Sequence, residues 1–155
     1  MKKLLLVWMV FLTNFSYAQK AEVKWLSFPE LEIAITKNPQ KVIVNFYADW
    51  CVFCKKMENV VYTKPEVVKA LNANYYAVRF NVESQDSIYF GGKTFYNIEA
   101  GKKRRAYHEI AQLLAGQKNK SLELPAIVIL DENFTIKKRY FRYISPKEML
   151  SILKN

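Results

Sequence analysis

The stretch that decides the fold is VIVNFYADWCVFC, residues 42–54. Residues 42–47 form a nearly continuous apolar run, which predicts a central β-strand buried on both faces. Residues 49–51 are expected to turn out of that strand, and a helix is expected from about Cys51 to Val60. The two cysteines therefore stand one turn apart at the N-terminus of a helix.

The Cys51–Cys54 pair is suited to thiol–disulfide exchange. At the start of a helix, unpaired backbone N–H groups and the helix dipole favour a negative charge. The thiolate, which is the attacking form of cysteine, is therefore stabilised at Cys51. Cys54 lies close enough to attack a mixed disulfide on Cys51 and release the partner. We predict that Cys51 is the nucleophile and Cys54 the resolving thiol.

These two cysteines are the only ones in the chain. Exported proteins commonly use disulfides to hold their folds together. A bridge between Cys51 and Cys54 would close a very small ring and would remove little entropy from the unfolded chain. The spacing therefore favours redox chemistry over an inert structural bridge.

Other uses of the pair stay open at this point. A closed zinc site needs four ligands, and His108 is the only histidine that could join the two cysteines, so no metal site is predicted. Two thiolates can hold monovalent copper, which leaves a copper chaperone as one alternative. A redox-inactive, peptide-binding module is the other.

The N-terminus predicts export. Residues 2 and 3 are lysines, residues 4–12 are apolar, and Ser16-Tyr17-Ala18 supplies small residues for cleavage, as in a secretory signal peptide. The apolar run is shorter than the roughly 20 residues that span a bilayer. We therefore expect residues 1–18 to be removed, with no membrane anchor afterwards. A single domain over residues 19–155 is then expected in the periplasm.

The chain is basic, with a formal net charge of +10. Such an excess can indicate a nucleic-acid or membrane-surface partner. An exported protein rarely meets nucleic acid, and no motif supports such binding here. We interpret the charge as a solvated basic surface.

The flanking sequence predicts alternating helices and strands. A capping box at Ser27–Glu30 opens a helix that ends at Asn38-Pro39. A second capping box, at Thr63–Glu66, is expected to open a helix through Leu71, followed by a strand over residues 75–82.

The second half of the chain predicts an insert and then a hairpin. Residues 83–123 are expected to form an inserted β-hairpin around Gly91-Gly92 and a helix carrying Tyr107, Ile110, Ala111 and Leu114. Residues 126–130 and 134–143 are expected to pair antiparallel, and Ser145 to cap a last helix. This order predicts an α/β fold with one central mixed sheet and helices on both faces.

Residues 47–55, YADWCVFCK, resemble the active-site segment of thioredoxins. The segment is most similar to the periplasmic C-terminal domain of the bacterial membrane thiol:disulfide interchange protein. The similarity continues through Met57-Glu58 and residues 64–71. Leu124-Pro125 resembles the cis-proline loop of the family. The resemblance implies the thioredoxin fold, with the insert placed before the cis-proline strand.

The same resemblance implies roles for three residues beside the cysteines. Pro125 would lie against the pair with a cis peptide bond before it, and Leu124 would recognise the bound polypeptide, which pairs as an added strand. Trp50 would form part of the docking surface, although a buried core tryptophan is the alternative. No organic cofactor is implied.

The sequence departs from the family pattern at position 45. Thioredoxins usually carry a buried aspartate six residues before the first cysteine, whereas this chain has Asn45, which does not titrate. Proton transfer to or from Cys54 must then use water or another group, and Asp49 and Glu58 are candidates. Asn45, Asp49 and Lys55 are predicted to support the site.

The insert carries residues whose function the sequence leaves open. Residues 102–105, KKRR, are either a partner-recognition element or a solubilising loop, and the second interpretation is favoured. His108 is interpreted as structural.

Together these features predict a thiol:disulfide oxidoreductase of the cell envelope that acts as a reductant or isomerase. Its partners would be the thiols and disulfides of exported proteins. Its electrons would come from a membrane donor.

Overall fold

The structure is a computed structural model that describes residues 21–118 and 120–154. The predicted signal peptide, residues 1–18, lies outside the described residues. The chain folds around a five-stranded sheet in the order β1-β3-β2-β6-β7. These strands are β1 (Trp25–Leu26), β2 (Val42–Tyr47), β3 (Tyr76–Asn81), β6 (Ala126–Leu130) and β7 (Ile136–Tyr140).

The apolar run of residues 42–47 forms the central strand, as predicted. Strand β2 pairs parallel with β3, where Phe46 faces Phe80. It pairs antiparallel with β6, where Phe46 faces Ala126. Strands β2 and β3 therefore end at the same edge of the sheet at which β6 begins, and the chain leaves β2 toward the cysteines at that edge.

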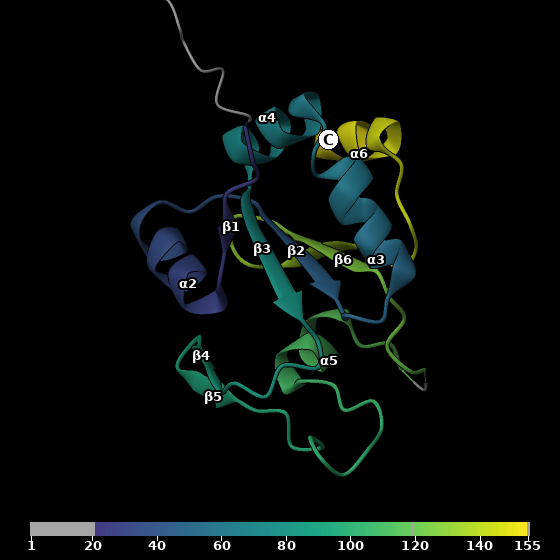
Figure 1. Ribbon diagram of the computed structural model, residues 1–155. Helices are drawn as coiled ribbons and strands as arrows, with labels where there is room; N and C mark the ends of the chain where they lie inside the picture. The colour runs from purple at the N-terminus through teal and green to yellow at the C-terminus, as the bar shows by residue number, and fades with distance from the viewer. Residues whose placement is uncertain (1–20, 119, 155) are drawn as a thin grey trace, which may run out of the picture.

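Helices cover both faces of the sheet, and Figure 1 shows the central strands between α2 on one side and α3 and α6 on the other. The helices are α2 (Phe28–Lys37), α3 (Val52–Lys56), α4 (Pro65–Asn74), α5 (Glu109–Ala115) and α6 (Pro146–Leu153). A π-helical turn, η1 (Met57–Val61), continues α3. The predicted α/β class with a central mixed sheet is confirmed.

The alternation of side chains along β2 separates two hydrophobic clusters. Val42, Val44 and Phe46 pack with residues of α2 and α5 on one face. Ile43 packs on the other face with residues of η1, α4 and α6. Asn45 follows the direction of Ile43 and therefore points to the face that carries η1.

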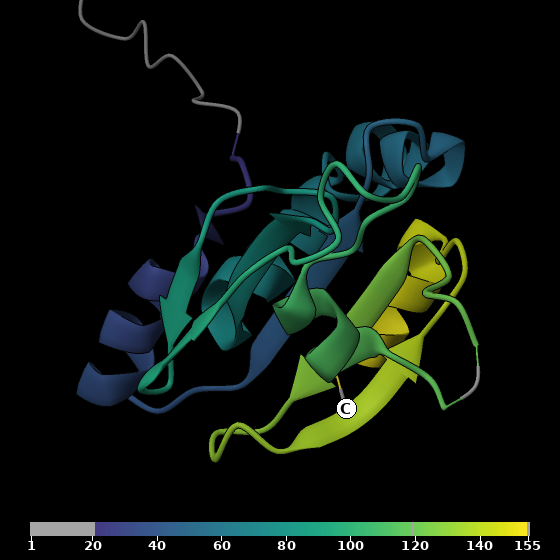
Figure 2. The ribbon, with the colours of Figure 1, turned by 90° about the horizontal axis from the view of Figure 1, so that it is seen from below.

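The insert forms the predicted hairpin and helix before β6. Strands β4 (Ile88–Phe90) and β5 (Lys93–Phe95) pair antiparallel, and Gly91 and Gly92 connect them with φ angles of 62° and 74°, a backbone region that glycine enters without steric cost. In Figure 1, the hairpin and α5 lie below the sheet edge toward which the arrowheads of β2 and β3 point. Figure 2 views the molecule from that edge, with α5 in front of the sheet.

Several predicted boundaries are wrong. Thr63 is not a helix cap, because Lys64 is the N-cap of α4 and makes no side-chain capping bond. The Thr63 hydroxyl donates instead to the carbonyl of Asn59, 2.8 Å away.

Tyr107, which was expected within the helix of the insert, precedes α5. Phe134 belongs to the turn before β7, with a φ of 60°. Strand β1, which is two residues long, was not predicted.

Candidate active site

The cysteine pair lies where β2 gives way to α3. Cys51 and Cys54 form a disulfide, with Cα atoms 5.2 Å apart. Cys51 is the N-cap of α3, and its backbone N–H donates to the carbonyl of Ala48, 3.0 Å away. Both side chains are nearly buried, with exposed fractions of 4% and 5%. The predicted position of the pair at a helix N-terminus is confirmed.

The backbone around the pair favours negative charge on Cys51. The N–H of Cys54 donates to the Cys51 sulfur at 3.1 Å. This donor belongs to the first turn of the helix, where N–H groups lack partners within the helix. A thiolate at Cys51 would therefore receive a hydrogen bond from a positively polarised helix end.

Leu124 and Pro125 lie at the start of β6. The peptide bond between them is cis, as the resemblance implies. Because Phe46 pairs with Ala126, Pro125 lies next to the end of β2, the strand that leads to Cys51. Leu124 is half-buried against the cluster that also contains both cysteines.

Trp50 is a surface residue, which removes the alternative of a buried core tryptophan. Its side chain is 43% exposed. Its indole N–H donates to the carboxylate of Glu83 at 3.0 Å, and the guanidinium of Arg105 lies 4.1 Å from its ring centroid. Two residues of the insert therefore hold the tryptophan that precedes Cys51.

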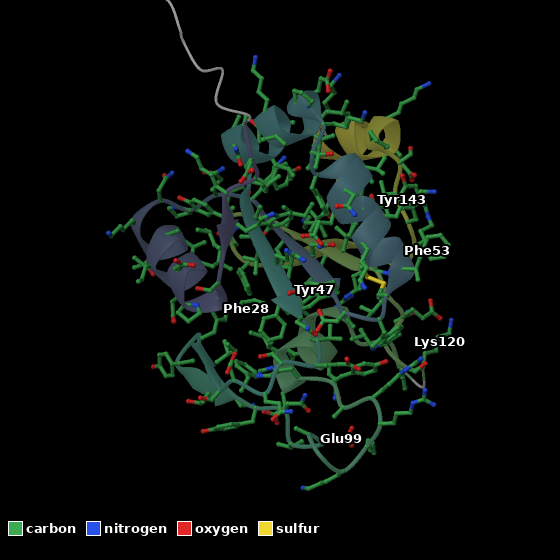
Figure 3. All side chains as sticks on the ribbon, in the orientation of Figure 1. Phe28, Tyr47, Phe53, Glu99, Lys120 and Tyr143 are labelled. Atoms are coloured by element: carbon green, nitrogen blue, oxygen red, sulfur yellow. A yellow bond between two sulfur atoms is a disulfide. The ribbon has the colours of Figure 1, made fainter. Side chains whose placement is uncertain are left out.

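Exposed apolar side chains surround the pair. We name Trp50, Val52 and Phe53 the apolar rim; Val52 is 75% exposed and Phe53 56%. Figure 3 shows Phe53 near Tyr143, beside the disulfide, and their ring centroids are 6.4 Å apart. Lys56 lies over the Tyr143 ring, with its ammonium 4.9 Å from the centroid. Exposed apolar residues that cluster in this way are typical of an interaction surface.

A small cavity of about 50 Å³ lies behind Cys54, between the end of β2 and the helical segment that follows the pair. Its lining includes Asn45, Cys54, Glu58 and Arg79. Asn45 is buried, and its side-chain oxygen has no hydrogen-bond partner among the described residues. The cavity is large enough for a water molecule, which a buried amide oxygen can bind.

Glu58 and Arg79 form an ion pair at this cavity. Two nitrogen–oxygen contacts of 2.8 Å join their side chains, and the Arg79 guanidinium also lies 4.2 Å from the ring centroid of Tyr47. Of the two groups predicted to exchange protons with Cys54, Glu58 is thus held in place by an arginine. Asp49 and Lys55 also line the cavity and are otherwise exposed to solvent.

His108 is buried and structural, as interpreted from the sequence. It caps α5, because its Nδ1 accepts from the backbone N–H of Ile110 at 3.2 Å. Its Nε2 lies 3.0 Å from the carbonyl oxygen of Asp86, so the neutral imidazole donates there. Burial lowers the pKa of His108, while the Asp86 carbonyl and the charges of Glu109 and Asp86 oppose that shift.

The sequence did not predict Glu83 and Arg79 as site residues, and it left the role of Arg105 open. Glu83 lies 33 residues from Trp50 along the chain, and no short motif links such distant positions. Within residues 21–118 and 120–154, no cluster of three or more His, Cys, Asp or Glu side chains could hold a metal ion. No helix in the same ranges has the length and apolar character needed to cross a membrane.

A family model described as "Thioredoxin-like domain" matches residues 28–155. The chain belongs to the thioredoxin-like domain family. This match confirms the resemblance of residues 47–55 to the thioredoxin active-site segment. Together with the Cys51–Cys54 pair, it supports the predicted enzyme class, thiol:disulfide oxidoreductase.

Similar proteins agree with this thioredoxin-like assignment. The thiol:disulfide interchange protein DsbD of Pectobacterium atrosepticum is 42% identical over 43 residues, which are 28% of this chain and 8% of that protein. The chain thus matches a small part of this curated relative.

Two solved structures share the fold of this thioredoxin-like domain. The DsbH oxidoreductase has a TM-score of 0.58 at 18% identity, covering 92% of this chain and 90% of its own. The reduced C-terminal domain of DsbD from Neisseria meningitidis has a TM-score of 0.50 at 17% identity, with coverages of 80% and 88%.

Proposed function

We propose that this thioredoxin-like protein is exported to the periplasm and reduces or isomerises disulfides of envelope proteins through Cys51 and Cys54. The observation that carries the proposal is the hydrogen bond from the Cys54 N–H to the Cys51 sulfur at the start of α3. This bond favours the thiolate at the cysteine that also adjoins the exposed Trp50. The pair therefore has an activated sulfur next to a surface where a polypeptide can dock.

The reaction proceeds in two thiol–disulfide exchange steps. The Cys51 thiolate attacks one sulfur of the substrate disulfide, forms a mixed disulfide and releases the other substrate sulfur as a thiolate. Cys54 then loses its proton and attacks the Cys51 sulfur, which releases the second substrate thiolate. The substrate gains two electrons, and Cys51–Cys54 becomes the oxidised disulfide. Sulfur atoms carry the electrons, so no organic cofactor is needed.

The proton of Cys54 leaves through the cavity behind it. Asn45 cannot accept that proton because an amide does not titrate. A water molecule bound to the Asn45 oxygen could pass the proton toward Glu58, which lines the same cavity. Arg79 holds the Glu58 carboxylate in place.

The oxidised pair must be reduced again before another turnover. An exported protein has no access to the reductants of the cytosol, so we propose that a membrane protein with an exposed dithiol supplies the electrons. The same exposed surface around Trp50 would receive that donor and the substrates in turn.

The first test of the mechanism is a Cys51→Ser variant. We expect wild-type protein, supplied with reductant, to reduce a disulfide-containing model protein, and the variant to show only the background rate, because serine cannot form the mixed disulfide. A Cys54→Ala variant should accumulate a covalent mixed disulfide, since the resolving thiol is missing. Equal rates for wild type and Cys51→Ser would disprove the proposed function.

The direction of electron flow is tested by the reduction potential of the pair. We expect a value of about −270 mV, at the reducing end of the thioredoxin-fold scale. The measurement equilibrates the protein in graded thiol–disulfide buffers and counts free thiols by alkylation and mass spectrometry. A value of about −120 mV would instead make the protein an oxidant.

A further inference from the structure

The insert contributes directly to the surface around the cysteines. Glu83, at its beginning, accepts a hydrogen bond from the Trp50 indole at 3.0 Å. Arg105, which follows 22 positions later, places its guanidinium 4.1 Å from the ring centroid of the same side chain. A cation over a tryptophan face is a favourable contact. The loop that carries Arg105 is therefore fixed to the residue preceding Cys51.

Hydrogen bonds inside the insert hold Arg105 in this position. The side-chain amide of Asn97 donates to the carbonyl oxygens of Ser84 and Ala106, at 3.1 and 2.9 Å. The backbone N–H of His108 donates to the carbonyl of Val82 at 2.7 Å. These bonds tie Asn97 and residues 106–108, the two ends of the segment that carries Arg105, to the residues that follow β3. A loop held in this way presents its charges at defined places.

Residues 102–105 form the basic loop, Lys102, Lys103, Arg104 and Arg105, and all four are exposed. Lys103 pairs with Glu99, whereas Lys102 and Arg104 have no carboxylate partner among the described residues. In α3, the helix that carries Cys54, Lys55 and Lys56 are also exposed.

Few acidic groups offset these charges near Trp50. The carboxylate of Glu83 is already bonded to the indole N–H. The exposed carboxylates that remain are Asp49, next to Trp50, and Glu123, next to Leu124. The cations on the two sides of the apolar rim therefore outnumber the free carboxylates.

We propose that the basic loop and the apolar rim together select cysteine-containing polypeptides in which acidic residues flank the reacting cysteine. The inference rests on the proposed function and deepens it, because it names the substrate class. The apolar rim would cover the residues next to the cysteine, and the basic loop would attract the carboxylates beyond them. Arg105 is a specificity-determining residue in this arrangement, because it alone of the four also contacts Trp50.

The test compares three disulfide-linked peptides of equal length and equal apolar content. The residues flanking the cysteine are aspartate in one, asparagine in the second and lysine in the third. Reduced protein is mixed with each peptide, quenched with acid, and analysed by mass spectrometry to obtain a second-order rate constant. We expect the aspartate peptide to react roughly tenfold faster than the lysine peptide at low ionic strength. Salt at about 0.5 M should bring the ratio close to one, because it screens exposed charges.

Four variants separate charge at the loop from contact with Trp50. Arg105→Ala should lower the rate ratio by roughly threefold, and Arg105→Lys should lower it less, because the charge remains. Arg104→Ala removes the same charge from the same loop without loss of the ring contact, so its effect should be smaller than that of Arg105→Ala. Lys69→Ala, at an exposed position on α4, is the control and should leave the ratio unchanged.

Three results would overturn the proposal. Equal rates of the aspartate and lysine peptides with wild-type protein, or equal ratios for Arg105→Ala and Lys69→Ala, would disprove the selection while leaving the oxidoreductase activity established. No exchange with any of the three peptides would disprove the proposed function and, with it, the selection.

Discussion

At position 45 the chain carries an amide where thioredoxins usually carry a carboxylate, and the surroundings show how the site accommodates the change. Asn45 is buried with an unpartnered oxygen beside a cavity. A buried polar atom without a partner lowers the stability of the fold by about 1–3 kcal/mol. A water molecule bound to the Asn45 oxygen would offset most of this loss. We propose that Glu58 on η1, whose carboxylate pairs with Arg79, takes the proton in place of a side chain on β2.

His108 shows how a buried residue makes the fold sensitive to pH. Both ring nitrogens are engaged, Nδ1 as acceptor from Ile110 and Nε2 toward the Asp86 carbonyl. Its ring also packs against Phe80, with centroids 5.1 Å apart. A second proton would occupy Nδ1 and break the cap of α5, so the folded protein favours neutral imidazole.

We predict that His108 makes the protein less stable in mild acid. Because burial lowers its pKa in the folded state, the unfolded chain binds more protons below about pH 6.5, the ordinary value for histidine. The contribution is complete above that pH and is lost progressively as the pH falls toward the lowered pKa. Urea unfolding of wild type and His108→Asn at pH 8 and pH 5 measures it. Asparagine can still cap the helix, so the variant should lose less stability on acidification; equal losses would contradict the prediction.

Among single residues, the sequence predicted those that belong to short motifs. Cys51, Cys54 and the cis bond before Pro125 follow from local patterns and a family resemblance. Glu83 and Arg105 could not be found in this way, because their contacts with Trp50 join residues 33 and 55 positions apart. Such contacts depend on how the insert folds over the sheet edge.

At the scale of helices and strands, a predicted helix start is correct where the capping side chain accepts a hydrogen bond from the first turn of the helix. Ser27 and Ser145 accept hydrogen bonds from the backbone N–H groups of Glu30 and Glu148. Thr63 has the same sequence pattern, but its hydroxyl is bonded to Asn59 in the preceding helical turn. The pattern alone cannot show this competition between two adjoining helices. The two-residue β1 was missed because it is too short to show a periodicity.

We predict that alanine destabilises the protein more at Ser145, which caps a helix, than at Thr63, which does not. Ser145→Ala should lower the free energy of unfolding by about 1 kcal/mol, since α6 loses its N-cap. Thr63→Ala is the matched control and should cost no more than a few tenths of a kcal/mol, because no cap is lost. Chemical denaturation at one pH compares them. A larger loss for Thr63→Ala than for Ser145→Ala would contradict the assignment of the caps.

For the whole molecule, the central strand of residues 42–47 allowed the architecture to be predicted. A strand that is apolar at nearly every position requires cover on both faces, and the two hydrophobic clusters provide it. The sequence did not predict that η1 would be a π-helical turn or that a cavity would remain behind Cys54. Both depend on how η1 packs against the sheet, which periodicity does not encode.

The insert leaves the sheet beside the cysteines, so a change in the insert can change what the protein recognises. Strand β3 ends, and β6 begins, at the same edge from which α3 departs. Any polypeptide spliced between these two strands would emerge beside the cysteines, whatever its sequence. Natural variation or engineering at residues 83–123 could therefore exchange one recognition module for another while the sheet and the reactive sulfurs stay as they are.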